Sequence, residues 1–184
     1  MRTAGAQSTS EAPVYEITPE AGTINFRLTG SIVPGGTFWK WGARLTFTST
    51  DPSSGSLYIK IHAESLDTRN RRDDNRLKQK NGFDVQEHPY VTFQSTEIRQ
   101  TGPNAFIVSG TLTFRGITKG QSLTLTFDRE GDGRSEVDGM LYFDPRTDVV
   151  RNPRAPFVII ADRVEITVDI KGRRVSGPAL VFKQ

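Results

Sequence analysis

Apolar side chains recur at every second position along most of the chain from Val14 onward, with threonine or charged residues between them. A period of two residues is typical of β-strands that bury one face. The alternating apolar positions are Ile24, Phe26, Leu28, Leu45, Phe47, Leu57, Ile59, Ile61, Val91, Phe93, Phe106, Val108, Leu112, Phe114, Leu123, Leu125, Phe127, Leu141, Phe143, Val164, Ile166, Val168 and Ile170. The pattern predicts an all-β protein.

Short turn-forming segments separate these runs, which favours antiparallel neighbours. They read PGG at 34–36, DPSSG at 51–55, TGPN at 101–104 and REGDG at 129–133. With almost no helix to cover an apolar sheet face, the sheet must form a sandwich or close into a barrel. Closure removes exposed edges. We therefore predict an extended antiparallel β-barrel of about eight strands.

Residues 70–81 break the alternation without glycine or proline. They predict one or two short helical turns through Arg76, Leu77 and Lys80, with Asp73 or Asp74 as the cap. Residues 144–156, which contain three prolines and are rich in arginine, indicate a long loop or an edge segment.

The chain has 184 residues, a length typical of one domain. Residues 1–13 are small and polar and predict a disordered leader, which leaves 14–184 as a single β-barrel domain. The leader lacks the apolar stretch of a signal peptide. One interpretation is a mature exported chain with an added start Met; the other is an ordinary flexible N-terminus.

The charge balance argues against nucleic acid as a partner, because 24 basic and 21 acidic residues leave a net charge of only +3. The arginines at 69, 71, 72 and 76 alternate with acidic residues at 67, 73 and 74, so local ion pairing explains them better than a polyanion site. There are no cysteines, which excludes disulfides and thiolate metal sites. No apolar run approaches the roughly 18 residues that span a bilayer as a helix.

Neither histidine indicates a metal site. His62 lies on the polar face of a predicted strand and His88 precedes a proline, and neither has a second ligand at a suitable spacing. The segment from Asp128 to Gly133 resembles the start of a calcium loop, but the twelfth position is Gly139, and strands rather than helices flank it. We interpret it as a solvated hairpin turn and predict no metal.

Two aspartates are the candidates for buried acids, Asp67 and Asp84, and capping of turns at strand ends explains both. No catalytic serine, phosphate-binding or zinc-protease motif occurs. We therefore predict a protein that is not an enzyme, with no catalytic residues and no cofactor.

The inward face of the predicted barrel is the candidate binding surface. The side chains predicted to line it are Phe26, Phe38, Phe47, Ile59, Ile61, Phe93, Phe106, Val108, Leu112, Leu125, Phe143 and Ile166. A barrel of about eight strands is either filled by its own side chains or just wide enough for one small ligand. The periodicity alone leaves both arrangements open. If ligand contacts fell on Thr46, Lys60, Thr92 and Thr126 instead, the predicted phase would be wrong.

Several spaced motifs resemble the YceI family of polyisoprenoid-binding, lipocalin-like proteins over almost all of residues 15–170. The first motif group is Ser65, Leu66, Asp67, Thr68, Asp74, Arg76, Leu77, Phe83, Asp84, Pro89, Phe93 and Ser95. The second is Gly110, Leu112, Thr113, Phe114, Gly116, Thr118 and Lys119, followed by Val164, Ile166 and Val168 in a closing strand.

The chain departs from the family pattern at several polar positions. An early His-Ser pair is replaced by Ala21 and Gly22, the loop histidine by Arg76 and the first phenylalanine of a pair by Gly82. A late R-x-D-F-G motif is reduced to Arg146, Asp148 and Val149. Polar contacts of the family at these positions are therefore not carried over to this chain.

The resemblance implies a lipocalin-like barrel that binds, sequesters or transports a long-chain isoprenoid or another amphiphilic lipid. The expected ligand is a polyprenol, an isoprenoid quinone or a fatty-acid-like chain, and the residues expected at the cavity mouth are Arg71, Arg72, Asp74 and Arg76. Family members are often exported, so the resemblance also implies a periplasmic or secreted protein. A homodimer is compatible with these features.

A second hypothesis needs no ligand in the barrel. It is a dry-cored domain that binds a protein partner through the charged loop at 69–80. An internal volume too small for a lipid chain would favour it.

Overall fold

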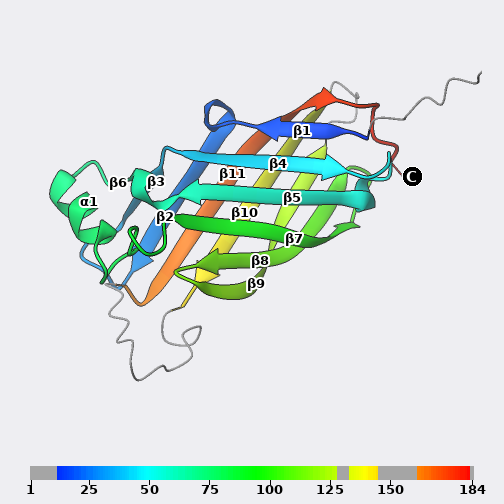
Figure 1. Cartoon of the computed structure of the whole chain (residues 1–184). Helices are drawn as coiled ribbons and strands as arrows, with labels where there is room; N and C mark the ends of the chain where they lie inside the picture. The colour runs from blue at the N-terminus through cyan, green and yellow to red at the C-terminus, as the bar shows by residue number, and fades with distance from the viewer. Residues whose placement is uncertain (1–11, 128–132, 145–160, 183–184) are drawn as a thin grey trace, which may run out of the picture.

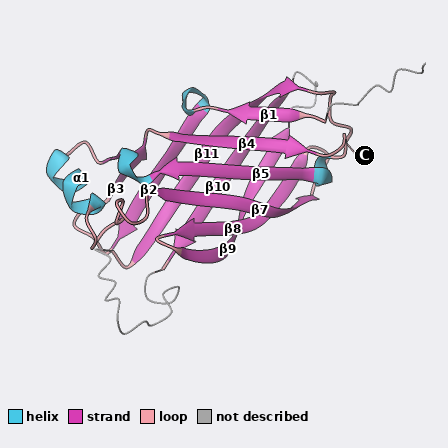
Figure 2. Ribbon diagram, viewed as in Figure 1, coloured by secondary structure: helices cyan, strands magenta, loops and turns pink. Residues whose placement is uncertain are grey.

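The computed structural model describes residues 12–127, 133–144 and 161–182, and these form one sheet with a single α-helix (Figure 1, Figure 2). The strands are β1 Val14–Ile17, β2 Gly22–Thr29, β3 Gly35–Phe38, β4 Trp41–Phe47, β5 Gly55–His62, β6 Leu66–Asp67, β7 Tyr90–Gln100, β8 Ala105–Phe114, β9 Ile117–Phe127, β10 Arg134–Phe143 and β11 Arg163–Ser176. The helices are α1 Arg71–Lys78 and the 3-10 turns η1 Pro19–Ala21, η2 Pro52–Ser54 and η3 Ala63–Ser65. The predicted leader and the predicted loop at 144–156 lie almost entirely outside the described residues, as does most of the calcium-like segment.

The sheet closes into the predicted antiparallel barrel. Its strands follow the order β1-β4-β5-β7-β8-β9-β10-β11, and β1 pairs again with β11 to complete the ring. Five of the eight ring strands, β7 to β11, are consecutive in sequence and pair with one another in that order. The prediction of about eight strands is confirmed, with β2, β3 and β6 as additional strands.

The additional strands arise because two strands share one edge of β11. Residues 163–170 of β11 pair with β2, whereas Arg173, Arg174 and Ser176 pair with β1. The turn η1 separates β1 from β2 at this point. Beyond it, β2 pairs with β3 and β3 with β6, so the sheet continues past the ring toward α1.

Helix α1 lies at the predicted position, but its N-cap residue differs from the prediction. Asn70, not Asp73 or Asp74, is the N-cap, and its side-chain oxygen accepts a hydrogen bond from the backbone N–H of Arg72 at 3.0 Å. Asp74 lies inside the helix, and its Oδ1 instead accepts from the Thr68 hydroxyl at 2.7 Å. The helix ends at Lys78, so Lys80 lies beyond it.

A bulge in β7 changes which positions face the interior. The register against β8 shifts between Ser95 and Glu97. Before the shift Val91 and Phe93 are buried, and after it the buried residue is Ile98. An inserted residue moves every later side chain to the other face, so the period of two is interrupted here.

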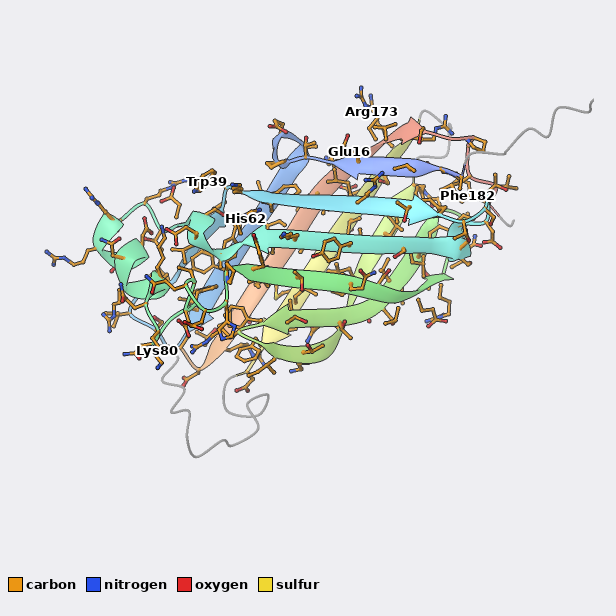
Figure 3. All side chains as sticks on the ribbon, viewed as in Figure 1. Glu16, Trp39, His62, Lys80, Arg173 and Phe182 are labelled. Carbon is orange, nitrogen blue, oxygen red and sulfur yellow. The ribbon has the colours of Figure 1, made fainter. Side chains whose placement is uncertain are left out.

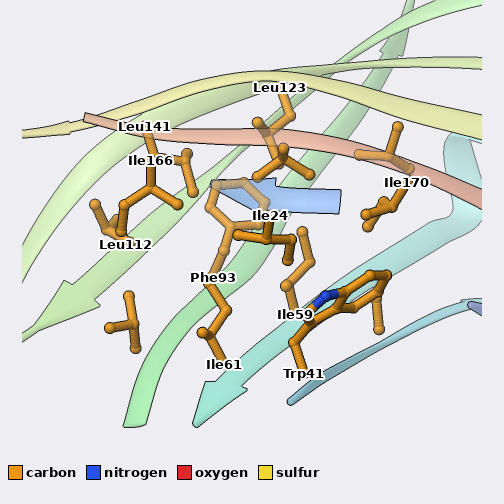
Figure 4. Close-up of a cluster of buried hydrophobic side chains, with 14 of the residues drawn as sticks. Ile24, Trp41, Ile59, Ile61, Phe93, Leu112, Leu123, Leu141, Ile166 and Ile170 are labelled. Atoms are coloured by element: carbon orange, nitrogen blue, oxygen red, sulfur yellow. The ribbon is translucent and has the colours of Figure 1, made fainter. Parts of the chain in front are cut away.

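The core runs along the whole barrel and is aromatic at both ends. We call the first group the α1-end cluster: Phe26, Phe38, Phe83, Phe114 and Phe143. We call the second the C-terminal cluster: Tyr15, Phe47, Phe106, Phe127 and Phe182. Aliphatic side chains fill the space between them, among them Ile24, Ile59, Leu123 and Leu141 (Figure 4).

Candidate ligand-binding interior

The predicted lining residues all face the barrel interior. All twelve have an exposed fraction of 5% or less, among them Phe26, Phe38, Phe47, Phe93, Phe106, Val108 and Phe143. The other five, Ile59, Ile61, Leu112, Leu125 and Ile166, are also buried. The outward alternatives Thr46, Lys60, Thr92 and Thr126 are only half-buried. These burials agree with the predicted phase of the strands, and contact of the side chains with a ligand stays a prediction.

The strand side chains of the interior are almost entirely apolar. Among the described residues, the buried polar or charged ones are Ser65, Asp84, Arg115 and Ser135. Of these, only Ser135 lies within a long barrel strand, and its Oγ has no hydrogen-bond partner within the described part of the chain. Such a surface attracts apolar groups and offers almost no polar recognition along its length.

The interior side chains cover one another in this conformation. Ile24, Leu45, Leu57, Ile59, Phe106 and Ile166 each have an exposed fraction of 0%. Trp41, which sequence reasoning did not assign to the interior, packs among them with 5% exposed (Figure 4). A ligand chain entering the barrel must therefore displace side chains that already fill space.

At the α1 end of the barrel, a buried cation holds the segment that follows α1. Arg115 lies in the turn between β8 and β9, with 5% exposed, and its Nη1 donates to the carbonyl of Gly82 at 2.7 Å. Its Nη2 donates to the carbonyl of Lys80 at 3.1 Å and lies 3.9 Å from Asp84 Oδ2. Burial lowers the pKa of the Arg115 guanidinium, and Asp84 opposes this shift. The segment after α1 is thus fixed to the barrel rim.

The segment between α1 and Asp84 folds back tightly on the helix. The backbone N–H of Phe83 donates to the carbonyl of Leu77 at 2.6 Å. A Cβ on Gly82 would lie only 2.1 Å from that same carbonyl oxygen. The glycine that departs from the family's phenylalanine pair is therefore required by this close approach.

The four predicted mouth residues lie on α1, which sits at one end of the barrel (Figure 1). The side chains of Arg71, Arg72 and Arg76 are exposed, and Asp74 is half-buried. Asp74 Oδ1 also accepts the backbone N–H of Thr68 at 2.8 Å, so this carboxylate fixes the entry to the helix. A contact between the arginines and a ligand stays a prediction.

The titratable candidates have local partners. Asp67 is exposed, so it is not a buried acid, and its Oδ1 accepts the N–H of Arg69 at 2.7 Å, as predicted for a turn cap. Asp84 is buried, and its carboxylate faces Arg115. The His62 ring packs edge-on against Tyr90, and burial, followed by Lys40 and Lys60, lowers the pKa of His62. No three His, Cys, Asp or Glu side chains of the described residues come together as a metal site.

Sequence reasoning missed the segment that crosses the barrel end opposite α1. After Gly177 the chain leaves β11 and crosses the barrel end, where Leu180 is 8% exposed and Phe182 packs on Phe127 with ring centroids 5.6 Å apart (Figure 3). The apolar residues at 180 and 182 repeat the period of two, which was the available signal. The preceding Gly177 and Pro178 mask this signal, because a Gly-Pro pair indicates an irregular segment.

A family model described as the YceI-like domain matches residues 15–172. A UPF0312 protein of Pseudomonas syringae pv. syringae is 31% identical over 96 residues, which cover 52% of this chain and 50% of the relative. A UPF0312 protein of Photorhabdus laumondii is 31% identical over 104 residues, which cover 56% and 53%. The alignments therefore span about half the length of the curated relatives.

Solved structures share the fold. BcnA of Burkholderia cenocepacia has a TM-score of 0.67 at 24% identity, covering 84% of this chain and 98% of that one. A polyisoprenoid binding domain from Saccharophagus degradans, implicated in plant cell wall breakdown, has a TM-score of 0.62 at 13% identity, covering 87% and 98%. At these identities the similarity shows the fold. Within the described residues, no helix is long and apolar enough to cross a membrane.

Proposed function

Because this chain belongs to the family of the YceI-like domain, we propose that its barrel binds a long-chain isoprenoid or another amphiphilic lipid and sequesters or transports it without catalysis. The observation that carries the proposal is the continuous apolar lining contributed by all the ring strands between two aromatic clusters. The solved polyisoprenoid binding domain with this fold supports the same class of ligand.

The energy of binding comes from apolar burial. Each methylene removed from water contributes about 0.8 kcal/mol, so ten contribute roughly 8 kcal/mol before the costs of ordering are subtracted. Displacement of side chains that now cover one another adds a further cost. The proposal therefore favours a long chain over a short one, since only a long chain offsets that rearrangement.

The head group belongs at the α1 end in this proposal. Arg71, Arg72 and Arg76 are exposed there and present guanidinium donors that suit a phosphate or a carboxylate. Polyprenols, isoprenoid quinones and fatty-acid-like chains are the ligand classes to compare. We also propose that such a carrier is exported and acts in the periplasm or outside the cell.

The test is native mass spectrometry of the purified protein, followed by titration of the delipidated protein with a polyprenol, a quinone and a fatty acid. We expect a co-purified lipid and saturable binding of at least one class. Phe93→Ala should alter the affinity about tenfold, whereas Thr92→Ala, its outward neighbour on β7, should not. Protein without lipid that binds none of the three classes would refute the proposal.

One observation favours a second candidate function. The 0% exposure of many interior residues also suits a dry core whose exposed α1 arginines bind a protein partner. The combined Arg71→Glu and Arg76→Glu variant separates the candidates. A lipid carrier should lose affinity for a polyprenyl phosphate and keep it for the polyprenol. A partner-binding domain should lose its partner and show no lipid binding before or after the change.

A further inference from the structure

We infer that Leu180 and Phe182 form the floor of the binding interior and set the longest apolar chain that the barrel accepts. The inference rests on the proposed function and adds the residues that determine its chain-length specificity. It follows from three features of the segment 177–182: where it lies, which of its side chains point inward and how it is held.

The segment lies across the barrel end opposite α1, as Figure 3 shows from the positions of Phe182 and Lys80. It leaves β11 at Gly177, whose φ of +80° is rarely adopted by residues with side chains. A Cβ at this position would also lie 2.5 Å from the carbonyl oxygen of Ala12. The glycine thus allows the chain to turn from the barrel wall across its opening.

The side chains of the segment alternate between the interior and solvent. Leu180 is 8% exposed, Val181 is 64% exposed and Phe182 is half-buried. The Phe182 ring contacts Phe127 at 5.6 Å and Phe106 at 6.3 Å between centroids, so it joins the C-terminal cluster. Where Leu180 and Phe182 meet Tyr15 and Phe127, a small pocket of about 20 Å³ remains, and Arg134 and Arg174 also line it.

The segment is held differently from the rest of the lining. The ring strands are fixed on both sides by ladders of backbone hydrogen bonds. Residues 178–182 belong to no strand, and a backbone hydrogen bond from the N–H of Val181 to the carbonyl of Thr50, at 2.9 Å, holds them to the barrel. An apolar chain that enters at the α1 end and lies along the barrel therefore meets Leu180 and Phe182 at its tail.

The test measures affinity against chain length. The full-length protein is titrated with all-trans prenyl alcohols of increasing length by displacement of a fluorescent fatty acid. Wild-type affinity should rise with length and then stop rising at one chain length. The Leu180→Ala/Phe182→Ala variant should bind the chain one isoprene unit longer about tenfold more tightly than the wild type does. Val181→Ala changes the exposed neighbour in the same segment and should leave the limit unchanged.

The outcomes separate this inference from the proposed function. If the wild type binds no prenyl alcohol, quinone or fatty acid, the proposed function fails and the floor fails with it. If the wild type shows a length limit that the double variant retains, only the floor is overturned. The milder Phe182→Leu variant keeps the test valid should the double variant unfold, and it should shift the limit in the same direction. An equal shift in Val181→Ala would also overturn the inference.

Discussion

The guanidinium of Arg115 donates a 2.7 Å hydrogen bond to the carbonyl oxygen of Gly82. This bond joins the turn between β8 and β9 to the segment that follows α1, across more than thirty residues of sequence. Removing the partners of a buried cation is costly, because the charge stays buried without them. Removing the cation is costly too, because its partners lose their donor. The rim of the barrel at the α1 end therefore depends on one side chain.

Arg115→Met should destabilise the fold by about 2–4 kcal/mol, because the carbonyls of Gly82 and Lys80 lose their donor and Asp84 loses its opposing charge. Urea unfolding followed by fluorescence measures the change. Arg99→Met, an exposed arginine of β7, is the matched control and should change the free energy of unfolding by less than about 0.5 kcal/mol. Equal effects in the two variants would contradict the role of Arg115 in holding the rim.

Gly110 and Gly120 on neighbouring strands should respond oppositely to alanine. A Cβ on Gly110 would lie 2.4 Å from the Gln94 carbonyl oxygen beside the β7 bulge, whereas a Cβ on Gly120 meets nothing within 4 Å. Gly110→Ala should lower the free energy of unfolding by roughly 1–3 kcal/mol. Gly120→Ala should leave it unchanged or raise it by a few tenths. Thermal unfolding of both variants decides, and a stable Gly110→Ala would show that the bulge relaxes.

Asn70→Ala should weaken the start of α1 by about 1 kcal/mol, because the N–H of Arg72 loses its side-chain acceptor. The effect should be local, since α1 is mostly exposed. Amide hydrogen exchange across 70–78 is the suitable measurement. Asn75→Ala, an exposed substitution within the helix, should leave exchange unchanged or slow it. Faster exchange only in Asn75→Ala would refute Asn70 as the cap.

A cluster of acidic residues on the outer face of β10 and β11 should make the free energy of unfolding depend on pH in the acidic range. Although the Asp138 side chain is largely exposed, its partial desolvation and then the charges of Glu136 and Asp169 raise the pKa of Asp138 above its ordinary value. The folded state therefore holds this proton more tightly than the unfolded state does, and stability falls as pH rises from the ordinary value of 3.8 through the raised one.

Asp138→Asn removes this repulsion and should stabilise the protein at pH 7 by less than about 1 kcal/mol, because the exposed side chain is screened by water. At pH 3, where Asp138 is protonated in both states, the gain should disappear. Melting temperatures of the wild type and the variant at the two pH values measure the difference. A gain of equal size at pH 3 would show that charge is not its cause.

The alternation along the strands predicted the barrel and the inward residues, because burial of one sheet face imposes a period of two on the sequence. The short strands β3 and β6 carry too few residues to show that period. The role of Asn70 as cap was missed because Asp73 and Asp74 are equally good capping residues in sequence. The hydrogen bonds of Arg115 could not be predicted, since its acceptors are backbone carbonyls that only the folded chain brings to it.

The shared edge of β11 also has a kinetic consequence. The ring closes through β1, a strand of four residues. Its Val14 pairs with Ser176, so the closure joins positions near the two ends of the described chain. The hairpins from β7 to β10 join residues that are close in sequence and have little loop entropy to overcome. The meander should therefore form early, and docking of β1 should be the late step that completes the barrel. Pulling on the chain just before Val14 should reverse that order and open the wall between β4 and β11 first.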